Sequence, residues 1–360
     1  MQALYDRLAK PLLYSIEDPE RAHKLATLSM NGLLGFPGLR RAMEHHFHVD
    51  DDILRQRVLG RQLDGAVLMG AGVDKRATLI GFASALGLNG IEVGTFTPKP
   101  QEGNPRPRMR RHEGLRSFQN RMGFNNDGGK AAFERVNMVY PGNIIIGVSI
   151  GPNKETMSKG EDAIINDYRL LARLFGNTCD YLAINVSSPN TAGLREQQNN
   201  LGFVKDVIRS VKQETGKPVL IKISPDLPLN FAIEFCKNAA SSGIDGIIMT
   251  NTTTDYSAIP GSGAFGGGLS GSVLEMKSMR MLKAVTPELP KNLVKVSSGG
   301  VSTDAGAYMR IGHGASFVQV VTGLFENPFI ARDINEGLAR YLRNDGFDNI
   351  SEAIGWAIRK

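Results

Sequence analysis

The chain reads YLAINVSSPNT from residue 181 to residue 191. Its first four residues are apolar, which is typical of a buried strand. Two carboxamides, Asn185 and Asn190, flank the Ser188 hydroxyl where that strand ends. Amides in such a place can hold a flat polar ring by its donors and acceptors, and the hydroxyl can touch one C–H bond. Ser, Pro and Asn are also ordinary turn formers, so the interpretation depends on the other strand ends.

Seven more apolar, β-branched runs occur along the chain, with helix-like segments between them. The eight runs cover residues 66–70, 90–94, 144–150, 181–186, 219–223, 246–250, 294–296 and 316–321. Continuous runs with long crossovers are typical of parallel strands that are buried on both faces. Eight is the strand number of a closed (β/α)8 TIM barrel, so we predict an α/β fold of that class. A doubly wound sheet is the alternative, but it would bring a GxGxxG turn after its first strand, and none is there.

Composition and charge exclude few functions. Of the 360 residues, 41% are apolar and 22% are charged, and the net charge of +6 permits an anionic ligand or membrane surface without requiring either. Cys179 and Cys236 have no CxxC spacing, which indicates a reducing compartment and no cysteine-ligated metal. The six histidines form no HExxH pair. We therefore expect no metal.

The sequence predicts no membrane-spanning helix. No run approaches the roughly 18–20 apolar residues that would cross a bilayer. The N-terminus also lacks the order of charged and apolar residues that marks a secretory signal. We expect the chain to stay inside the cell, with any membrane contact restricted to the interface.

Residues 1–45 are predicted to form a small two-helix extension, and residues 46–360 the barrel. Asp18 and Pro19 are typical of a helix start, and Gly32 and Gly35 of its end. An earlier helix at about residues 3–14 carries apolar side chains at Leu4, Leu8, Leu12 and Leu13. The pair is either a cap packed on the barrel or a pair that enters the membrane interface. Residues 58–63 predict a hairpin that closes the bottom of the barrel.

The functional site of such a barrel lies at the carboxyl ends of its strands. Glycines after the seventh and eighth strands, at Gly299, Gly300 and Gly323, suit a phosphate cradle, although each alone is an ordinary turn residue. Lys75 and Lys222 follow buried runs, and a cation there can stabilise a reduced ring or bind a carboxylate. A solvated lysine is the alternative for each of them.

A long excursion follows the second strand. It carries seven basic residues between Lys99 and Arg121 against two acidic ones. Nucleic-acid binding is one interpretation of this charge. The absence of interleaved aromatic residues, with Phe118 alone, weakens that interpretation, so we expect no nucleic-acid partner.

Together these stretches resemble the class 2, quinone-dependent dihydroorotate dehydrogenases over nearly the whole chain. The matching segments are residues 18–23, 71–75, 95–111, 120–126, 185–195, 222–227, 250–253, 267–271 and 298–301. The resemblance implies oxidation of (S)-dihydroorotate to orotate in pyrimidine (UMP) biosynthesis, with FMN as cofactor. It also implies that ubiquinone or menaquinone is the acceptor. A monomer, bound peripherally to the cytoplasmic side of the cell membrane through its N-terminal helices, is expected.

The resemblance also implies roles for particular residues. Ser188 matches the catalytic base that takes the C5 proton while hydride leaves C6, with a relay through Thr191 or water. Substrate contacts are expected at Lys75, Asn120, Arg121, Met122, Gly123, Phe124, Asn185, Asn190, Asn251 and Thr252. FMN contacts are expected at Ala71, Gly72, Val73, Asp74, Lys75, Thr95, Ser149, Asn185, Lys222, Thr250, Gly271, Gly300, Val321 and Thr322. His23 and Arg111 match positions at the quinone tunnel.

Two positions depart from the pattern of the family. Ser149 stands where the family usually has Asn, which leaves one flavin or substrate hydrogen bond in doubt. Val321 stands where an aromatic hydroxyl is usual, so packing beside the flavin phosphate or the quinone differs.

The sequence is less consistent with three other functions. Class 1 relatives and tRNA-dihydrouridine synthases both use a catalytic Cys, and neither Cys179 nor Cys236 lies in the predicted catalytic loop. The class 1 relatives also have no N-terminal extension, and the synthases carry an added RNA-binding domain that this chain lacks. A membrane-surface binding module would leave the amides at the strand ends unexplained.

Overall fold

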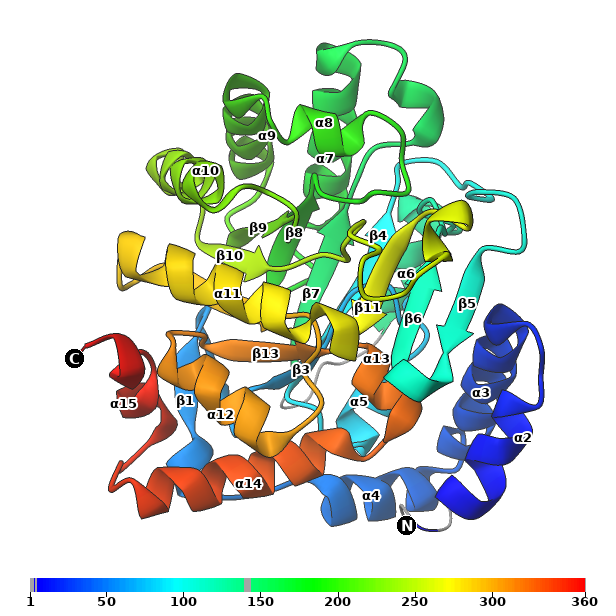
Figure 1. Cartoon of the computed structure of the whole chain (residues 1–360), viewed down its shortest axis with the longest axis vertical. Coiled ribbons are helices and arrows are strands. Elements are labelled where there is room, and N and C mark those ends of the chain that lie inside the picture. Colours follow the sequence, from blue (N-terminus) through cyan, green and yellow to red (C-terminus); the bar gives the residue numbers. More distant parts are fainter. Residues whose placement is uncertain (1–2, 4, 139–143, 360) are drawn as a thin grey trace.

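The computed structural model describes residues 3, 5–138 and 144–359, and its centre is a closed barrel of eight parallel strands (Figure 1). The strands are β3 (Val67–Met69), β4 (Gly90–Phe96), β7 (Ile145–Ile150), β8 (Tyr181–Asn185), β9 (Val219–Ile223), β10 (Gly246–Met249), β12 (Val294–Ser298) and β13 (Phe317–Val320). They pair in chain order, and β13 closes the ring on β3. The prediction of eight strands in a (β/α)8 barrel is confirmed, and the doubly wound alternative is wrong.

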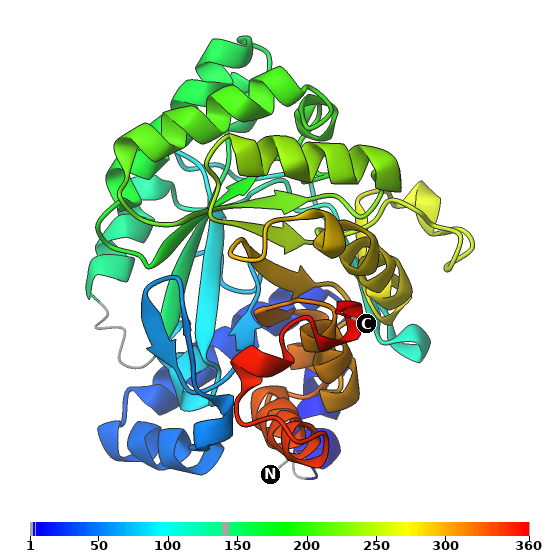
Figure 2. The ribbon, with the colours of Figure 1, turned by 90° about the vertical axis from the view of Figure 1, so that its left-hand side faces the viewer.

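Helices connect the strands and cover the outside of the barrel (Figures 1 and 2). The covering helices are α5 (Ile80–Ala85), α6 (Gly129–Met138), α7 (Glu161–Phe175), α9 (Leu201–Glu214), α10 (Leu229–Ser241), α11 (Glu275–Val285), α12 (Asp304–Gly312) and α14 (Ile330–Asn344). Shorter helices are α8 (Leu194–Gln197), α13 (Thr322–Glu326) and α15 (Ile350–Ala353). Alternate strand residues face these helices and the barrel interior, which explains why the strand runs are continuously apolar.

The bottom of the barrel is filled by large side chains and covered by a hairpin. β1 (Gln56–Val58) and β2 (Arg61–Leu63) form the predicted antiparallel hairpin. Leu63 packs with Leu220 and Tyr181 in a fully buried cluster inside the strand ring. Gly147 makes room for this packing, because a Cβ atom there would lie 2.1 Å from the Tyr181 ring. The interior is therefore a packed core at this end, and only the opposite end is open to ligands.

The N-terminal segment is more helical than predicted. A short π-helix, η1 (Tyr5–Ala9), continues into α2 (Lys10–Tyr14), and α3 (Pro19–Leu34) follows. The Asp18 side chain caps α3 by accepting a hydrogen bond from the backbone N–H of Glu20 at 2.9 Å, as predicted. Leu4 lies outside the described residues. The predicted stop at Gly32 is wrong, because Gly32 lies inside α3; the helix ends at Leu34, and Gly35 is its C-cap.

A third N-terminal helix, α4 (Pro37–Phe47), was not predicted. It begins two residues after Gly35, where the sequence indicated only the end of a helix. Phe47 anchors α4 to the barrel, since its buried ring stacks on Phe329 with 4.7 Å between the ring centres. The division of the chain at residue 45 falls inside this helix, and that division stays a prediction. Within the described part of the chain, no helix is long and apolar enough to cross a membrane.

A small antiparallel sheet stands at the open end of the barrel. It contains β5 (Met109–His112), β6 (Ser117–Asn120) and β11 (Gly268–Gly271), in the order β11-β6-β5. β5 and β6 come from the excursion after β4, and β11 comes from the glycine-rich loop after β10. Asn120 pairs with Gly268 in this sheet. Two loops that are about 150 residues apart in the sequence thus form one wall of the site.

Candidate active site

A cavity of about 480 Å³ opens at the carboxyl ends of the barrel strands. Most of the predicted site residues line it: Ala71, Gly72, Lys75, Thr95, Asn120, Met122, Gly123, Phe124, Asn185, Ser188, Asn190, Lys222, Thr250, Asn251, Thr252, Gly271, Gly300, Val321 and Thr322. They come from all parts of the chain, and the barrel closure brings them together. The volume is in the range of sites that bind small molecules or cofactors.

Two carboxamides are held in fixed orientations at the end of β8 and β10. The Asn185 Nδ2 group donates to Thr95 Oγ1 at 2.8 Å, and Asn251 donates to Asn185 Oδ1 at 3.3 Å. Ser149 is fully buried and shares a 2.8 Å hydrogen bond with Thr95. The short Ser149 side chain therefore supports Thr95, which in turn orients Asn185.

The predicted base lies among the other two amides. Ser188 is 5% exposed, and its Oγ accepts a hydrogen bond from the backbone N–H of Asn190 at 3.3 Å. Asn190 donates its amide to Asn120 Oδ1 at 3.0 Å. The side-chain oxygens of Asn190, Thr191 and Thr252 are buried, and none has a partner among the described residues. Unsatisfied buried acceptors beside a cavity indicate that a polar ligand completes them.

The floor of the cavity carries a buried ion pair. Lys222 Nζ lies 3.9 Å from Glu92 Oε1, and the Glu92 side chain is completely buried. Gln319 and Tyr181 donate to the other Glu92 oxygen at 2.8 and 3.1 Å. Burial lowers the pKa of Lys222, and the charge of Glu92 opposes that effect. Lys222 is therefore a buried lysine that is paired with a carboxylate under the cavity, rather than a solvated lysine.

Glu92 was missed in the sequence. The sequence does contain a signal for it, which is a charged residue inside the apolar run at residues 90–94. A buried charge without a partner is unfavourable, so this residue indicates a buried partner. Its partner Lys222 lies 130 residues later in the chain, and only the closed ring of strands brings the two together.

Lys75 lies at the edge of the cavity and is partly buried. Burial lowers its pKa to about 8, while Glu20 raises it and Arg108 lowers it further. The neighbouring Asp74 holds the loop rather than the cavity, because its carboxylate accepts backbone N–H groups at 2.7 to 3.1 Å. Burial raises the pKa of Asp74, and those hydrogen bonds oppose the rise. Val73 and Asp74 line a neighbouring cavity of about 780 Å³, which also contacts Lys75.

A glycine turn after β12 forms another part of the wall. Gly299 and Gly300 have φ angles of +111° and +74°, and a Cβ atom on Gly300 would lie 2.5 Å from the Glu275 Cα atom. The buried Arg310 supports the turn by donating to the Gly299 carbonyl oxygen at 2.8 Å and to Ser297 Oγ at 2.7 Å. Side chains are excluded here, so a phosphate can approach the backbone closely. Arg310 was also missed in the sequence.

The predicted quinone-tunnel residues lie at the base of the N-terminal helices. Arg111 donates to the carbonyl oxygens of Leu13, Tyr14 and Ile16 at 2.9 to 3.2 Å, so it holds the link between α2 and α3. His23 lines the neighbouring cavity and contacts the Val73 carbonyl oxygen at 2.9 Å.

The environment of His23 favours its neutral form. Burial lowers its pKa to about 4, and the charge of Lys75 adds to this effect. Its ring also meets that of Phe325 edge to face, with 5.5 Å between the centres. Because Phe325 lines the 480 Å³ cavity, His23 is close to both cavities.

Arg121 directly follows β6 of the small sheet. Its guanidinium donates to the Pro107 carbonyl oxygen at 2.8 and 3.0 Å and lies over the Phe265 ring, 4.6 Å from its centre. Its role as a substrate contact stays a prediction, and these contacts assign it to the support of the loop. Among the described residues, no group of three or more His, Cys, Asp or Glu side chains could hold a metal ion.

The cavity extends from the barrel mouth to the N-terminal helices. Lys10 of α2 forms a 2.7 Å ion pair with Glu326, the last residue of α13. Tyr14 donates to the other Glu326 oxygen at 2.6 Å. Lys10, Phe325 and Glu326 all line the cavity beside Val321. The end under the N-terminal helices is therefore partly polar.

These features define an α/β-barrel enzyme. One part of its cavity is lined by amides, and another part contains a glycine turn and a buried lysine. A sequence profile of the dihydroorotate dehydrogenase family matches residues 53–342, and the chain belongs to this family. It is an oxidoreductase of the quinone-dependent class, because relatives that match it over their full length are named as quinone-dependent enzymes.

The relatives are similar over their whole length. Dihydroorotate dehydrogenase (quinone) of a Nitratiruptor species is 42% identical over 99% of both chains, and that of a Sulfurovum species is 43% identical over 98% of both. The crystal structure of the Eimeria tenella enzyme in complex with ferulenol is 29% identical, with a TM-score of 0.83 over 97% of this chain and 99% of that one. The region of similarity therefore includes the N-terminal helices.

Proposed function

We propose that this protein oxidises (S)-dihydroorotate to orotate, with FMN as cofactor and a quinone as electron acceptor. The observation that carries the proposal is the position of Ser188 among four carboxamides in one cavity. Amides that are fixed in orientation suit a flat ring with alternating donors and acceptors. A carboxylate substituent on that ring suits the neighbouring Lys75.

The described residues fit FMN at the deeper part of the cavity. The Gly299–Gly300 turn leaves room for a phosphate, and Thr322 lies beside it with a 3.0 Å hydrogen bond to Ser270. Lys222 would supply a positive charge that stabilises a reduced isoalloxazine ring. When bound, FMN would supply a two-electron acceptor for the substrate hydride, from which the electrons would pass to the quinone.

Ser188 would take the proton from C5 of the substrate. A serine hydroxyl is a weak base, so the proton needs a further acceptor. The buried Thr191 hydroxyl, which lies three residues along the same loop, suits that relay together with water. Asn185 and Asn251 would hold the ring so that C5 faces the hydroxyl.

The buried state of both cysteines disfavours the rival functions. Burial raises the pKa of Cys179 to about 12, and it also raises that of Cys236. Neither thiol lines the cavity described above. A class 1 relative or a dihydrouridine synthase would need a Cys beside the substrate.

The N-terminal helices would admit the quinone from a membrane. The cavity reaches Lys10 of α2, and large apolar side chains nearby are exposed rather than packed: Leu8, Leu12, Leu25, Leu28, Leu33, Phe36 and Leu39. Exposed apolar groups on short amphipathic helices favour an interfacial position over a packed cap. We propose that a monomer lies on the cytoplasmic face of the cell membrane and serves pyrimidine biosynthesis, with ubiquinone or menaquinone as acceptor.

An anaerobic visible spectrum of the purified protein tests the proposal. The flavin band should bleach when dihydroorotate is added and return when a soluble quinone follows. A flavin band that does not change when dihydroorotate is added would overturn the proposed substrate. A band that bleaches but does not return would overturn the acceptor.

A further inference from the structure

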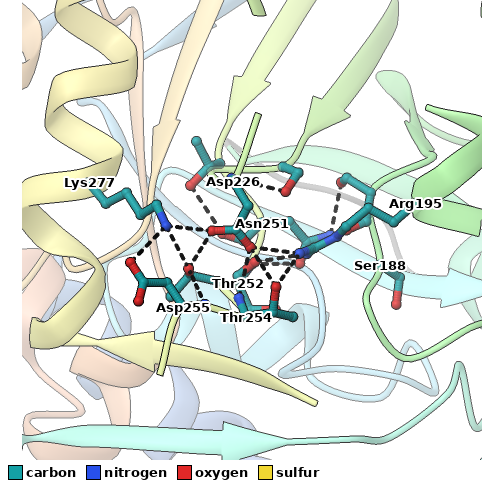
Figure 3. Close-up of polar contacts among 12 residues, drawn as sticks. Ser188, Arg195, Asp226, Asn251, Thr252, Thr254, Asp255 and Lys277 are labelled. Carbon is teal, nitrogen blue, oxygen red and sulfur yellow. Dashed lines mark hydrogen bonds and ion pairs between the residues drawn. The ribbon is translucent and has the colours of Figure 1, made fainter. Parts of the chain in front are cut away.

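Arg195 connects the main chains of two site loops. It lies in the short helix α8, seven residues after Ser188. Its guanidinium donates to the Ser187 carbonyl oxygen at 2.9 and 3.1 Å. It also donates to the Thr252 carbonyl oxygen at 2.9 Å. Figure 3 shows it between the loop of Ser188 and the loop that follows β10.

These contacts act on the peptide groups that carry the reacting and binding side chains. The Ser187 carbonyl belongs to the peptide plane that contains the nitrogen and Cα atoms of Ser188. Fixing that carbonyl therefore restricts the position of the Cα atom from which the Ser188 side chain leaves the backbone. The Thr252 carbonyl belongs to a residue that itself lines the cavity.

Asp226 holds the guanidinium in place from a third loop. Its Oδ2 atom accepts from Arg195 at 2.8 Å, and Asp226 follows β9, which lies between β8 and β10 in the barrel. Lys277 of α11 and the Thr253 hydroxyl contact the other carboxylate oxygen at 2.7 and 2.5 Å (Figure 3). Burial alone would raise the pKa of Asp226, but the hydrogen bonds from Lys277 and Thr253 hold it below its ordinary value.

Only an arginine can make this set of contacts. A planar guanidinium presents five N–H groups in fixed directions, whereas a lysine presents one flexible ammonium group. Arg195 uses three of its nitrogen atoms for three acceptors on three different loops. Asn251 also links two of these loops, through Ser187 Oγ at 3.0 Å, but that contact joins side chains and leaves the peptide planes free.

We propose that Arg195 is a positioning residue that keeps Ser188 aligned with the substrate held at Thr252, and that Asp226 orients Arg195 for this task. The inference rests on the proposed oxidation of dihydroorotate. It predicts that Arg195 affects the reduction half-reaction alone, since none of its contacts reaches the glycine turn or the N-terminal helices.

The test is the rate of flavin reduction by dihydroorotate in single-turnover experiments on Arg195→Ala, Arg195→Lys and Asp226→Asn. A shift of the base by about 1 Å costs on the order of 100-fold in rate, and that loss is expected for Arg195→Ala. Arg195→Lys and Asp226→Asn should lose less. FMN content and reoxidation of dithionite-reduced protein by quinone should stay at wild-type values.

Added guanidinium separates positioning from a general loss of folding. Tens of millimolar guanidinium chloride should restore part of the rate of Arg195→Ala, whereas sodium chloride at the same concentration should not. Arg173→Ala is the matched control, because Arg173 forms an equally close pair with Glu214 on the exposed surface of α7. It should keep the wild-type rate.

Each other outcome has one meaning. A wild-type reduction rate in Arg195→Ala would overturn the positioning role and leave the proposed function standing. Loss of FMN in all three variants, or a loss of rate that guanidinium does not restore, would also overturn it. Wild-type flavin that dihydroorotate fails to reduce would overturn the proposed function, and this inference with it.

Discussion

The Ser188 hydroxyl has the most specific role in the proposed reaction, and its removal gives the sharpest prediction. Ser188→Ala should retain FMN, because Ser188 follows β8 whereas the Gly299–Gly300 turn that suits the phosphate follows β12, three strands further round the barrel. Flavin reduction by dihydroorotate should slow by about 10²- to 10⁴-fold, the usual contribution of a positioned base. Stopped-flow absorbance measures this rate. Ser241→Ala, at an exposed site in α10, is the control, and equal rates in both variants would contradict the role.

Lys75 gives a prediction for pH dependence. Its pKa of about 8 means that the ammonium group is charged below that pH and loses its charge above it. If it binds the substrate carboxylate, the wild-type advantage over Lys75→Met in kcat/KM should be largest below pH 7 and should decline as the pH rises through 8. The value of kcat/KM reports the free enzyme, where this pKa applies.

Steady-state assays from pH 6 to 10 provide the measurement. The exposed Lys130→Met in α6 is the control, and its ratio to wild type should be constant with pH. A constant ratio for Lys75→Met as well would show that Lys75 does not bind the carboxylate.

The helices α2 and α3 are expected to serve the acceptor alone. Deletion of residues 1–35 removes both helices but keeps α4, whose Phe47 packs on the barrel through Phe329. The shortened protein should still be reduced by dihydroorotate at a rate within about twofold of wild type. Turnover with a long-chain quinone should be lost. Loss of both activities would mean that the barrel needs these helices to fold, and circular dichroism distinguishes that case.

The sequence predicted the strands better than it predicted the helices and small sheet. The eight strands were recognisable because burial on both faces leaves a continuous apolar run, a local pattern. Helix α4 was missed since it starts so soon after Gly35. The β5–β6–β11 sheet was missed because Asn120 pairs with Gly268, and such long-range pairing leaves no periodic signal.

The same contrast applies to the site. Nineteen predicted site residues line one cavity, because the resemblance located their motifs and many of them follow a barrel strand whose end could be recognised. Glu92, Arg310 and Arg195 were not assigned roles, since each acts through partners that only the closed barrel brings near. Their partners Lys222, Gly299 and Thr252 had been selected as site residues or candidates for the phosphate turn, without the groups that hold them.

The molecule as a whole should bind anionic or neutral vesicles through its N-terminal surface. Leu8, Leu12 and Phe36 are each more than 60% exposed, and burying them in lipid is favourable by about 1.5–3 kcal/mol each. Triple replacement by Ser should lower the bound fraction in a vesicle sedimentation assay by at least tenfold. Met276→Ser on α11, which is 81% exposed, is the control. Unchanged binding of the triple variant would contradict an interfacial position of this surface.

The contacts of Glu326 have a consequence for selective inhibition. Val321 has a small side chain, and five residues later the Glu326 carboxylate pairs with Lys10 in the same cavity and accepts a hydrogen bond from Tyr14. An inhibitor that fills the space above Val321 and carries a polar group toward Lys10 or Glu326 would match this protein. The same compound would clash with a relative that carries a bulkier side chain at this position. Selectivity can thus be designed from one small residue and one charged pair.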